Sequence, residues 1–322
     1  MTSLKILSDM PLDEPTLTML RTGLAPSELV LPEQPVASVL ATAPYSIEGI
    51  DIAFGQPDPT GVLASKTLRW VHLTSAGYTR FDTPDFRTAA VERGLILTNS
   101  SSVYDEPCAE HVFAFMLAAA RQLPGALHVR CESGSEEWNR LRSNCRILHE
   151  QSIVILGFGA IAKHLLKLLA PFAARVTAFR RRARGDEEVP VVTLAELPKG
   201  LSSADHVVNI LPDNADSRHF INADRLGQIR PGAILYNIGR GTTVDQAALA
   251  GALRSGHLAA AWLDVTDPEP LPVGHPLLDL ENCHITPHIA GGHRNEPETL
   301  VQHFLGNFRR FLDGSPLRDR VL

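Results

Sequence analysis

The sequence is poor in cysteine, and the few cysteines present are not arranged for metal binding. Its 322 residues include only four cysteines, and no two of them form a C-x-x-C pair. The spacing matches neither a zinc site nor a disulfide framework and predicts reduced thiols in a cytoplasmic protein. We therefore expect no metal site.

Positive charge and long apolar segments are also scarce. Lys and Arg number 30 against 36 Asp and Glu, and the formal net charge of −6 argues against a general nucleic-acid binder. No basic segment followed by an apolar stretch marks a secretory signal near the start. The most apolar long segment, 111–120, is too short to cross a bilayer. We expect neither a nucleic-acid nor a membrane partner.

Apolar segments of strand length alternate with segments of helix length, and the chain is long enough for two domains. This alternation predicts parallel sheets covered on both faces. In the first domain the expected strands are 4–7, 36–41, 51–54, 68–73 and 95–98, with a helix over 14–24.

A helix over 107–121, with Pro107 in its first turn, is expected to lead into the second domain. Residues 132–144 are expected to be irregular. The later strands are expected at 152–156, 175–179, 206–211, 233–238, 260–263 and 284–286, with helices over 244–255 and 296–311. This order predicts a doubly wound sheet, with the last helix packing back on the first domain.

A glycine-rich turn separates the strand at 152–156 from the helical pattern that follows. A G-x-G-x-x-A motif in this position is typical of dinucleotide binding, because the glycines allow a tight turn and a close approach of the pyrophosphate. A tight turn without a ligand is the alternative. The residues expected to contact the dinucleotide here are Gly157, Phe158, Gly159, Ala160 and Ile161.

The next strand ends in three arginines where an acidic residue is usual. Arg180 lies 23 residues after Gly157, and an acid at this point would accept the ribose 2′-hydroxyl. A guanidinium group instead suits a 2′-phosphate. Arg180 and Arg181 therefore predict a preference for NADP(H), with NAD(H) possible, and a solvated basic turn is the alternative.

Three later residues follow the ends of buried strands and could perform chemistry. Arg240 stands between two glycines, Glu269 lies in a proline-rich segment, and His288 follows Pro287. Each alone has an ordinary explanation as a surface or structural residue. Because parallel strands end at one edge of a sheet, we expect the three to gather there, with the carboxylate fixing the tautomer of the imidazole and favouring its protonated form.

With these motifs in place, the chain resembles the D-isomer-specific 2-hydroxyacid dehydrogenases. The matching segments are GFGAIA, NIGRGTTVD, LDVTDPEPLP, HPLL and TPHIAGG, together with LTSAGYTRFD and CAEHVFAFMLAAAR nearer the N-terminus. The resemblance implies a Rossmann-type doubly wound parallel sheet domain (100–289) inserted into a flavodoxin-like substrate domain (1–99 and 290–322). It also implies a homodimer.

The same resemblance assigns roles to individual residues. Arg240 would bind the 2-oxo acid, Glu269 would orient His288, and His288 would exchange the proton. The backbone at Ala76 and Gly77 would hold the substrate carboxylate. Further contacts to the cofactor are implied for Leu211, Pro212, Ile238, Gly239, Asp264, His288 and Gly291.

The resulting hypothesis is an oxidoreductase that transfers a hydride between NAD(P)H and a small 2-oxo acid. Glyoxylate and hydroxypyruvate are the expected substrates. A dinucleotide-sensing corepressor of the same fold, which would bind the cofactor without turnover, is the alternative from a different class.

Overall fold

The computed structural model describes residues 3–33, 45–183, 185 and 187–322 and divides the chain into two compact units. Unit 1 comprises Met1–Tyr104 and His293–Leu322, and unit 2 comprises Asp105–Gly292. Unit 2 is thus inserted between two segments of unit 1. The strand expected over 36–41 lies outside the described residues.

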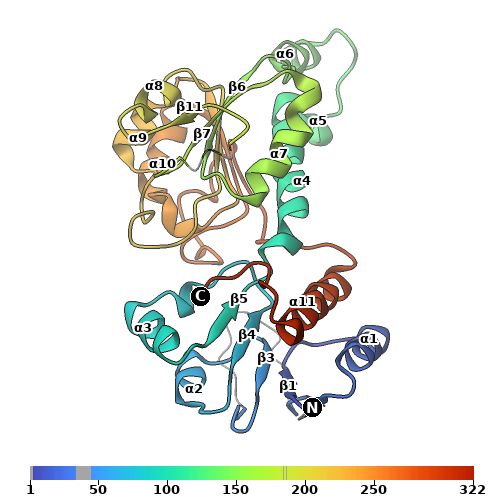
Figure 1. Cartoon of the computed structure of the whole chain (residues 1–322). Helices are drawn as coiled ribbons and strands as arrows, with labels where there is room; N and C mark the ends of the chain where they lie inside the picture. Colours follow the sequence, from blue (N-terminus) through green and yellow to red (C-terminus); the bar gives the residue numbers. More distant parts are fainter. Residues whose placement is uncertain (1–2, 34–44, 184, 186) are drawn as a thin grey trace. The chain divides into compact units, whose positions relative to one another are not determined.

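Unit 1 is built on a five-stranded parallel sheet with the strand order β2-β1-β3-β4-β5, the flavodoxin-like order (Figure 1). The short edge strand β2 was not expected from the sequence. The strands are β1 (Lys5–Ser8), β2 (Glu28–Val30), β3 (Ile52–Gly55), β4 (Trp70–Leu73) and β5 (Ile96–Thr98).

Helices cover this sheet, and the last helix of the chain is among them. The helices of unit 1 are α1 (Glu14–Leu24), α2 (Pro59–Ala64), α3 (Pro84–Glu92) and α11 (Glu296–Asp313). Helix α11 packs beside α1, as expected, and its Phe304 ring stacks on Phe54 of β3 with centroids 4.2 Å apart. Burial of such large aromatic rings is a major source of stability for the unit.

Unit 2 is built on a seven-stranded parallel sheet with the order β12-β11-β10-β9-β6-β7-β8. Read from β6, this is the Rossmann order with one added edge strand, and the strand order reverses between β6 and β9. The strands are β6 (Ser152–Leu156), β7 (Arg175–Phe179), β8 (Val191–Val192), β9 (His206–Asn209), β10 (Ala233–Asn237), β11 (Leu258–Leu263) and β12 (Cys283–Ile285).

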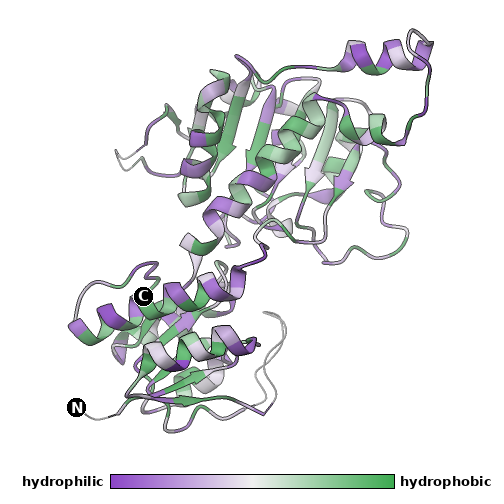
Figure 2. Ribbon diagram, turned by 90° about the vertical axis from the view of Figure 1, so that its right-hand side faces the viewer, coloured by the Kyte–Doolittle hydropathy of each residue, from purple (hydrophilic) through white to green (hydrophobic). Residues whose placement is uncertain are grey.

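The α-helices that lie wholly within unit 2 are α5 (Leu123–His128), α6 (Glu136–Asn144), α7 (Ala160–Leu169), α8 (Leu197–Leu201), α9 (Ala223–Gln228) and α10 (Gln246–Arg254). The central strands between them are largely hydrophobic (Figure 2), as expected for a parallel sheet buried on both faces. No helix in the described part of the chain is long and apolar enough to span a membrane.

The expectation for Pro107 was wrong, because helix α4 (Ser101–Ala120) begins before it and Pro107 lies in the helix interior. At the start of the helix, Asn99 Oδ1 accepts the backbone N–H of Ser101 at 3.3 Å. Proline removes one hydrogen bond from the helix. The helix continues because side chains beyond Pro107, such as Val112 and Met116, are fully buried.

The irregular stretch expected over 132–144 is also wrong for its second half, which forms helix α6. The Ser135 hydroxyl accepts the backbone N–H of Trp138 at 3.2 Å, and Glu136 and Glu137 lie in the first turn. A serine N-cap followed by acidic residues stabilises a helix start. None of the residues of this polar helix is buried, so the sequence has no apolar periodicity from which the helix could be predicted.

A buried histidine makes the stability of unit 2 sensitive to acid. His206 lies inside the sheet, where its Nδ1 is 3.0 Å from the Tyr236 hydroxyl, and burial lowers the pKa of His206 to about 4. The unfolded chain takes up a proton below about pH 6.5 while the folded chain does not. The contribution of His206 to the free energy of unfolding is therefore fully present above about pH 6.5. It falls as the pH drops toward 4, by about 2 kcal/mol at pH 5.

We expect His206→Gln to remove this share of the acid sensitivity. Urea unfolding of the wild type and the variant at about pH 7.5 and pH 5 measures this effect. The free energy of unfolding should change less between the two pH values in the variant than in the wild type. His149→Gln, at an exposed histidine, is the matched control. Equal pH dependence in wild type and His206→Gln would contradict the prediction.

Candidate active site at the carboxyl edge of the larger sheet

The glycine-rich turn after β6 has the geometry that a dinucleotide requires. Gly157 has φ +100°, and a Cβ atom there would lie 3.1 Å from the carbonyl oxygen of Ile210 on the turn after β9. Gly159 is the N-cap of α7, with no side-chain capping bond and nothing within 4 Å of where a Cβ would be. The helix start is thus open for a pyrophosphate to approach its N–H groups and positive dipole.

The neighbouring positions of this turn divide between core and surface. Phe158 packs into the hydrophobic core, so only its backbone can face a ligand. Ala160 is exposed, Ile161 is half-buried, and Ala162 is fully buried against the sheet. The small residue at the third motif position therefore serves helix–strand packing, as expected for this motif.

Arg180 stands at the end of β7 but is paired with a carboxylate that the sequence analysis missed. Its Nη1 lies 2.6 Å from Oε1 of Glu187, and both side chains are largely buried. Glu187 also accepts the backbone N–H of Gly185 at 2.8 Å. An acidic residue is therefore present beside the strand end, supplied from seven positions farther along the chain. The acidic run that contains Glu187 was the available signal.

Arg181 is more exposed and forms an ion pair with Asp216, which lies on the segment after β9. An exposed pair of this kind contributes little to stability. Both arginines expected to meet a 2′-phosphate thus have acidic partners in this structure. The carboxylates of Glu187 and Asp216 therefore partly neutralise the positive charge of this turn.

Arg240 follows β10 on a turn that a buried amide network holds in place. Asn237 donates from Nδ2 to the Arg240 carbonyl at 3.1 Å and accepts the Gly239 N–H at 3.1 Å. Asn209 donates from Nδ2 to Asn237 at 2.9 Å and to Thr243 at 2.6 Å. Fully satisfied networks of this kind rigidify a backbone. The sequence analysis did not identify Asn209 or Thr243.

Glycines on both sides of Arg240 allow neighbouring turns to touch. A Cβ on Gly239 would lie 2.6 Å from the Leu211 carbonyl oxygen, and one on Gly241 would lie 2.0 Å from the Thr266 backbone. These contacts leave no space for a side chain. They join the turn of Arg240 to the segment after β9, which contains Leu211 and Pro212, and to the turn after β11.

His288 and Glu269 form a hydrogen-bonded pair. His288 Nδ1 lies 2.6 Å from Glu269 Oε1, and both side chains are partly exposed. His288 follows β12 and Glu269 follows β11, so adjacent strands place them at the carboxyl edge of the sheet. The carboxylate sets the tautomer of the imidazole, which leaves Nε2 to act on a ligand. The expected pairing is therefore present.

Asp264 holds the loop that carries His288. Its buried carboxylate accepts the backbone N–H groups of Ile289 and Ala290, each at 2.9 Å, and the hydroxyl of Thr286 at 2.6 Å. Its carbonyl accepts the His288 N–H at 3.0 Å. His288 has φ +53°, an uncommon backbone conformation for a non-glycine residue, and Asp264 anchors the segment that adopts it. The expected contact of Asp264 with the cofactor stays a prediction.

The remaining predicted residues fall in two places. Ile238 is buried behind Arg240, Pro212 is exposed after β9, and Gly291 lies just beyond the Asp264-bound loop in unit 2. Ala76 and Gly77 lie in unit 1, half-buried on the loop after β4. The structure thus brings the catalytic and cofactor candidates together in unit 2 and places the substrate-loop candidates in unit 1.

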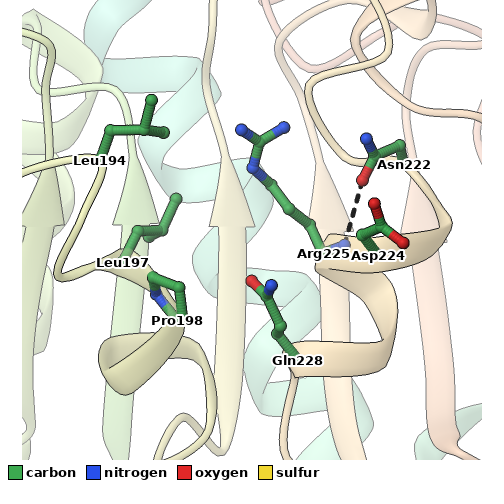
Figure 3. Close-up of a pocket in the computed structure, with 7 residues that line it drawn as sticks. All are labelled: Leu194, Leu197, Pro198, Asn222, Asp224, Arg225 and Gln228. Carbon is green, nitrogen blue, oxygen red and sulfur yellow. Dashed lines mark hydrogen bonds between the residues drawn. The ribbon is translucent and has the colours of Figure 1, made fainter.

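A separate surface pocket of about 260 Å³ lies beside α8 and α9 and contains none of these residues (Figure 3). Apolar side chains of Leu194 and Leu197 form one wall, and Asp224 and Arg225 lie on α9. Arg225 lies over the Phe220 ring at 4.0 Å from its centroid.

Comparisons with known proteins agree with this geometry. The family model for the D-isomer specific 2-hydroxyacid dehydrogenase, NAD binding domain, matches residues 113–290, which lie within unit 2. Glyoxylate/hydroxypyruvate reductase B of Pectobacterium atrosepticum is 36% identical over 256 residues, which is 78% of this chain and 77% of that protein.

Two solved structures resemble the entire chain. A D-isomer specific 2-hydroxyacid dehydrogenase of Xanthobacter autotrophicus in complex with NADPH and MES is 27% identical, with a TM-score of 0.78 over 100% of this chain and 98% of that one. An NADPH-dependent glyoxylate/hydroxypyruvate reductase of Sinorhizobium meliloti, in complex with NADP and malonate, is 25% identical, with a TM-score of 0.75 over 99% and 97%. Together with its glycine turn and its histidine–glutamate pair, these matches show that the chain belongs to the D-isomer specific 2-hydroxyacid dehydrogenase family.

Proposed function

We propose that this protein is a 2-oxo acid reductase that acts on glyoxylate or hydroxypyruvate and prefers NADPH. The observation that supports it most directly is the 2.6 Å bond between His288 and Glu269 at the carboxyl edge of a dinucleotide-binding sheet. Two of the relatives described above are named as glyoxylate/hydroxypyruvate reductases.

Three residues of unit 2 are proposed to transfer the proton, orient the imidazole and bind the substrate carboxylate. The bound nicotinamide supplies or accepts the hydride. His288 gives a proton from Nε2 to the carbonyl oxygen of the 2-oxo acid, or removes it from the hydroxy acid. Glu269 keeps the ring in the tautomer that presents Nε2 to the substrate. Arg240 binds the substrate carboxylate and stabilises the negative charge that develops on the reacting oxygen.

Unit 1 is proposed as the substrate domain and unit 2 as the dinucleotide-binding domain. The backbone N–H groups of Ala76 and Gly77, on the loop after β4, would bind the substrate carboxylate. Cofactor contacts are proposed for the turn at 157–161 and for Leu211, Pro212, Ile238, Gly239, Asp264, His288 and Gly291.

Activity can be tested directly with a panel of acids. Glyoxylate, hydroxypyruvate, pyruvate and phenylpyruvate would each be assayed with NADPH and with NADH by following nicotinamide absorbance. Turnover highest with glyoxylate or hydroxypyruvate would support the proposal. Binding of NADPH without turnover of any 2-oxo acid would instead favour the corepressor alternative, which no relative described above supports.

The preference for NADPH depends on how Arg180 is shared between Glu187 and a 2′-phosphate. A charged hydrogen bond contributes about 1.5–3 kcal/mol, or roughly tenfold to a hundredfold in affinity. We expect Arg180→Asp to remove or reverse the preference. Because the Glu187 carboxylate competes for the same guanidinium, Glu187→Gln is expected to tighten NADPH binding and leave NADH binding nearly unchanged.

Fluorescence titration of both cofactors measures these affinities. Arg175→Ala, at the opposite end of β7, serves as the matched control, because it removes a positive charge away from the strand end. Equal dissociation constants for NADPH and NADH in the wild type would contradict the proposed preference. Weaker NADPH binding in Glu187→Gln would show that Glu187 positions Arg180 and does not compete with the phosphate.

We also propose a homodimer in the cytoplasm. Large apolar side chains are exposed on and near α5 in unit 2, namely Leu123, Leu127 and Ile147. Exposed apolar side chains that lie close together are typical of subunit interfaces. The cytoplasmic location rests on the cysteine spacing, which matches no disulfide framework, and stays a prediction.

A further inference from the structure

The carbonyl groups at the end of β4 and in the loop after it accept hydrogen bonds from other groups of unit 1. Five consecutive carbonyl oxygens, those of residues 73–77, each accept a hydrogen bond. The donors are Ser100 Oγ to Leu73 (2.7 Å), the Tyr104 hydroxyl to Thr74 (2.7 Å), the Ser100 N–H to Ser75 (3.0 Å), Asn99 Nδ2 to Ala76 (2.7 Å) and Ser75 Oγ to Gly77 (2.6 Å). Such a complete set of bonds leaves the loop little freedom to rotate its peptide groups.

Fixing a carbonyl group also fixes the amide of the next residue. In a planar trans peptide the C=O and the N–H point in opposite directions. The bond to the Ser75 carbonyl therefore orients the N–H of Ala76, and the bond to the Ala76 carbonyl orients the N–H of Gly77. Within the described part of the chain, neither N–H has a hydrogen-bond acceptor. Two successive amides that point away from their anchors form a binding site for an anion.

Asn99 is the side chain that acts on the second of these amides. It is nearly fully buried, and its Oδ1 accepts the N–H and the hydroxyl of Ser101 at 3.3 and 3.0 Å. Only the side-chain oxygen of Asn99 can accept these two bonds, so the oxygen faces Ser101. The nitrogen Nδ2 therefore points toward the Ala76 carbonyl. The residue thus links the start of α4 to the loop after β4.

We propose that Asn99 is a positioning residue for the substrate carboxylate, because it holds the Gly77 N–H in the orientation that binds it. This inference rests on the proposed function, in which Ala76 and Gly77 bind the carboxylate. The side-chain amide of Asn99 is engaged by the Ala76 carbonyl and by Ser101. It acts through the peptide group between Ala76 and Gly77.

The variant that tests this role is Asn99→Asp. Aspartate keeps the oxygen that caps α4 and the size of the side chain, but it removes the donor and presents an oxygen to the Ala76 carbonyl. We expect KM for glyoxylate to rise about tenfold, while kcat changes less than twofold and the dissociation constant of NADPH is unchanged. A carboxylate contact of equal strength in the ground and transition states acts on KM alone.

Ser102→Ala is the matched control, because the Ser102 hydroxyl, also in the first turn of α4, bonds Asp319 at 2.7 Å and not Asn99 or the loop, and its KM should stay at the wild-type value. A second measurement, the dissociation constant of oxalate with NADPH bound, follows carboxylate binding without turnover. It should weaken in Asn99→Asp by the same factor as KM. If Asn99→Asp does not fold, Asn99→Ala lacks the oxygen–oxygen repulsion and replaces it.

The outcomes separate this inference from the proposed function. A wild-type enzyme that reduces no 2-oxo acid would overturn the proposed function, and the oxalate titration would still test the loop. Unchanged KM and oxalate binding in Asn99→Asp, or no oxalate binding by the wild type, would overturn the role of Asn99. A fall in kcat with KM unchanged would also overturn it.

Discussion

Replacing His288 by alanine is expected to lower kcat/KM for the 2-oxo acid by about 10²–10⁴-fold, the usual contribution of a positioned acid or base. In the proposed mechanism the imidazole is the proton donor, and its bond to Glu269 leaves Nε2 available for the carbonyl oxygen. NADPH should still bind, because the turn at Gly157 and Gly159 and the other proposed cofactor contacts remain when the His288 side chain is removed. Steady-state kinetics together with a NADPH titration measure both effects.

The exposed His149 offers a matched control for this variant. His149→Ala removes an imidazole from the same unit, and its kcat/KM should equal that of the wild type. Full activity in His288→Ala would mean that the proton comes from another group. Loss of NADPH binding together with activity would point to a disturbed fold and not to a lost acid.

The same pair predicts the effect of replacing Glu269 by glutamine. The amide of Glu269→Gln can bond His288 through its oxygen or its nitrogen, so the imidazole is no longer held in one tautomer. We therefore expect kcat/KM for the 2-oxo acid to fall while NADPH still binds. Steady-state kinetics with a NADPH titration measure both effects, and wild-type kcat/KM in Glu269→Gln would contradict the proposed pairing.

Replacing Arg240 by glutamine is expected to lower kcat by about 10²–10³-fold, the typical effect of removing one donor that stabilises charge on a reacting oxygen. Glutamine can still donate a hydrogen bond but carries no charge. Because the charge on the oxygen grows in the transition state, most of the loss should appear in kcat. The rise in KM should be smaller.

Arg230→Gln is the control for charge. Arg230 pairs with Asp205 near the starts of β9 and β10, at the opposite edge of the same sheet, and its loss should leave kcat unchanged. The Arg240 turn is held through the backbone by Asn237, so Arg240→Gln should keep its fold and its melting temperature. An Arg240→Gln enzyme with wild-type kcat would assign the stabilising role to another residue.

The sequence by itself determined the two parallel sheets and most of the candidate site. Apolar strand segments such as 152–156 and 175–179 are recognisable because a strand buried on both faces must be apolar throughout. Arg240, Glu269 and His288 could be predicted to gather because the carboxyl ends of parallel strands share one edge. Helix α11 was predictable from its strong apolar stripe, since one face of it packs on the sheet.

Local pattern could not find elements without an apolar face. The polar helix α6 depends on the Ser135 cap, and the start of α4 depends on Asn99, so neither boundary follows from hydrophobic periodicity. Pro107 misled the prediction because the burial of Val112 and Met116 stabilises the helix more than the missing hydrogen bond destabilises it.

Only the tertiary structure decided which groups meet across the chain. The partner of Arg180 is Glu187, because the chain returns to the strand end seven residues later. Gly241 must be glycine because the Thr266 backbone, 25 positions away, lies where its side chain would be. Asn99 reaches the Ala76 carbonyl from a different strand end. Hydrogen bonds and close contacts of this kind depend on distances between remote segments, and sequence spacing carries no record of those distances.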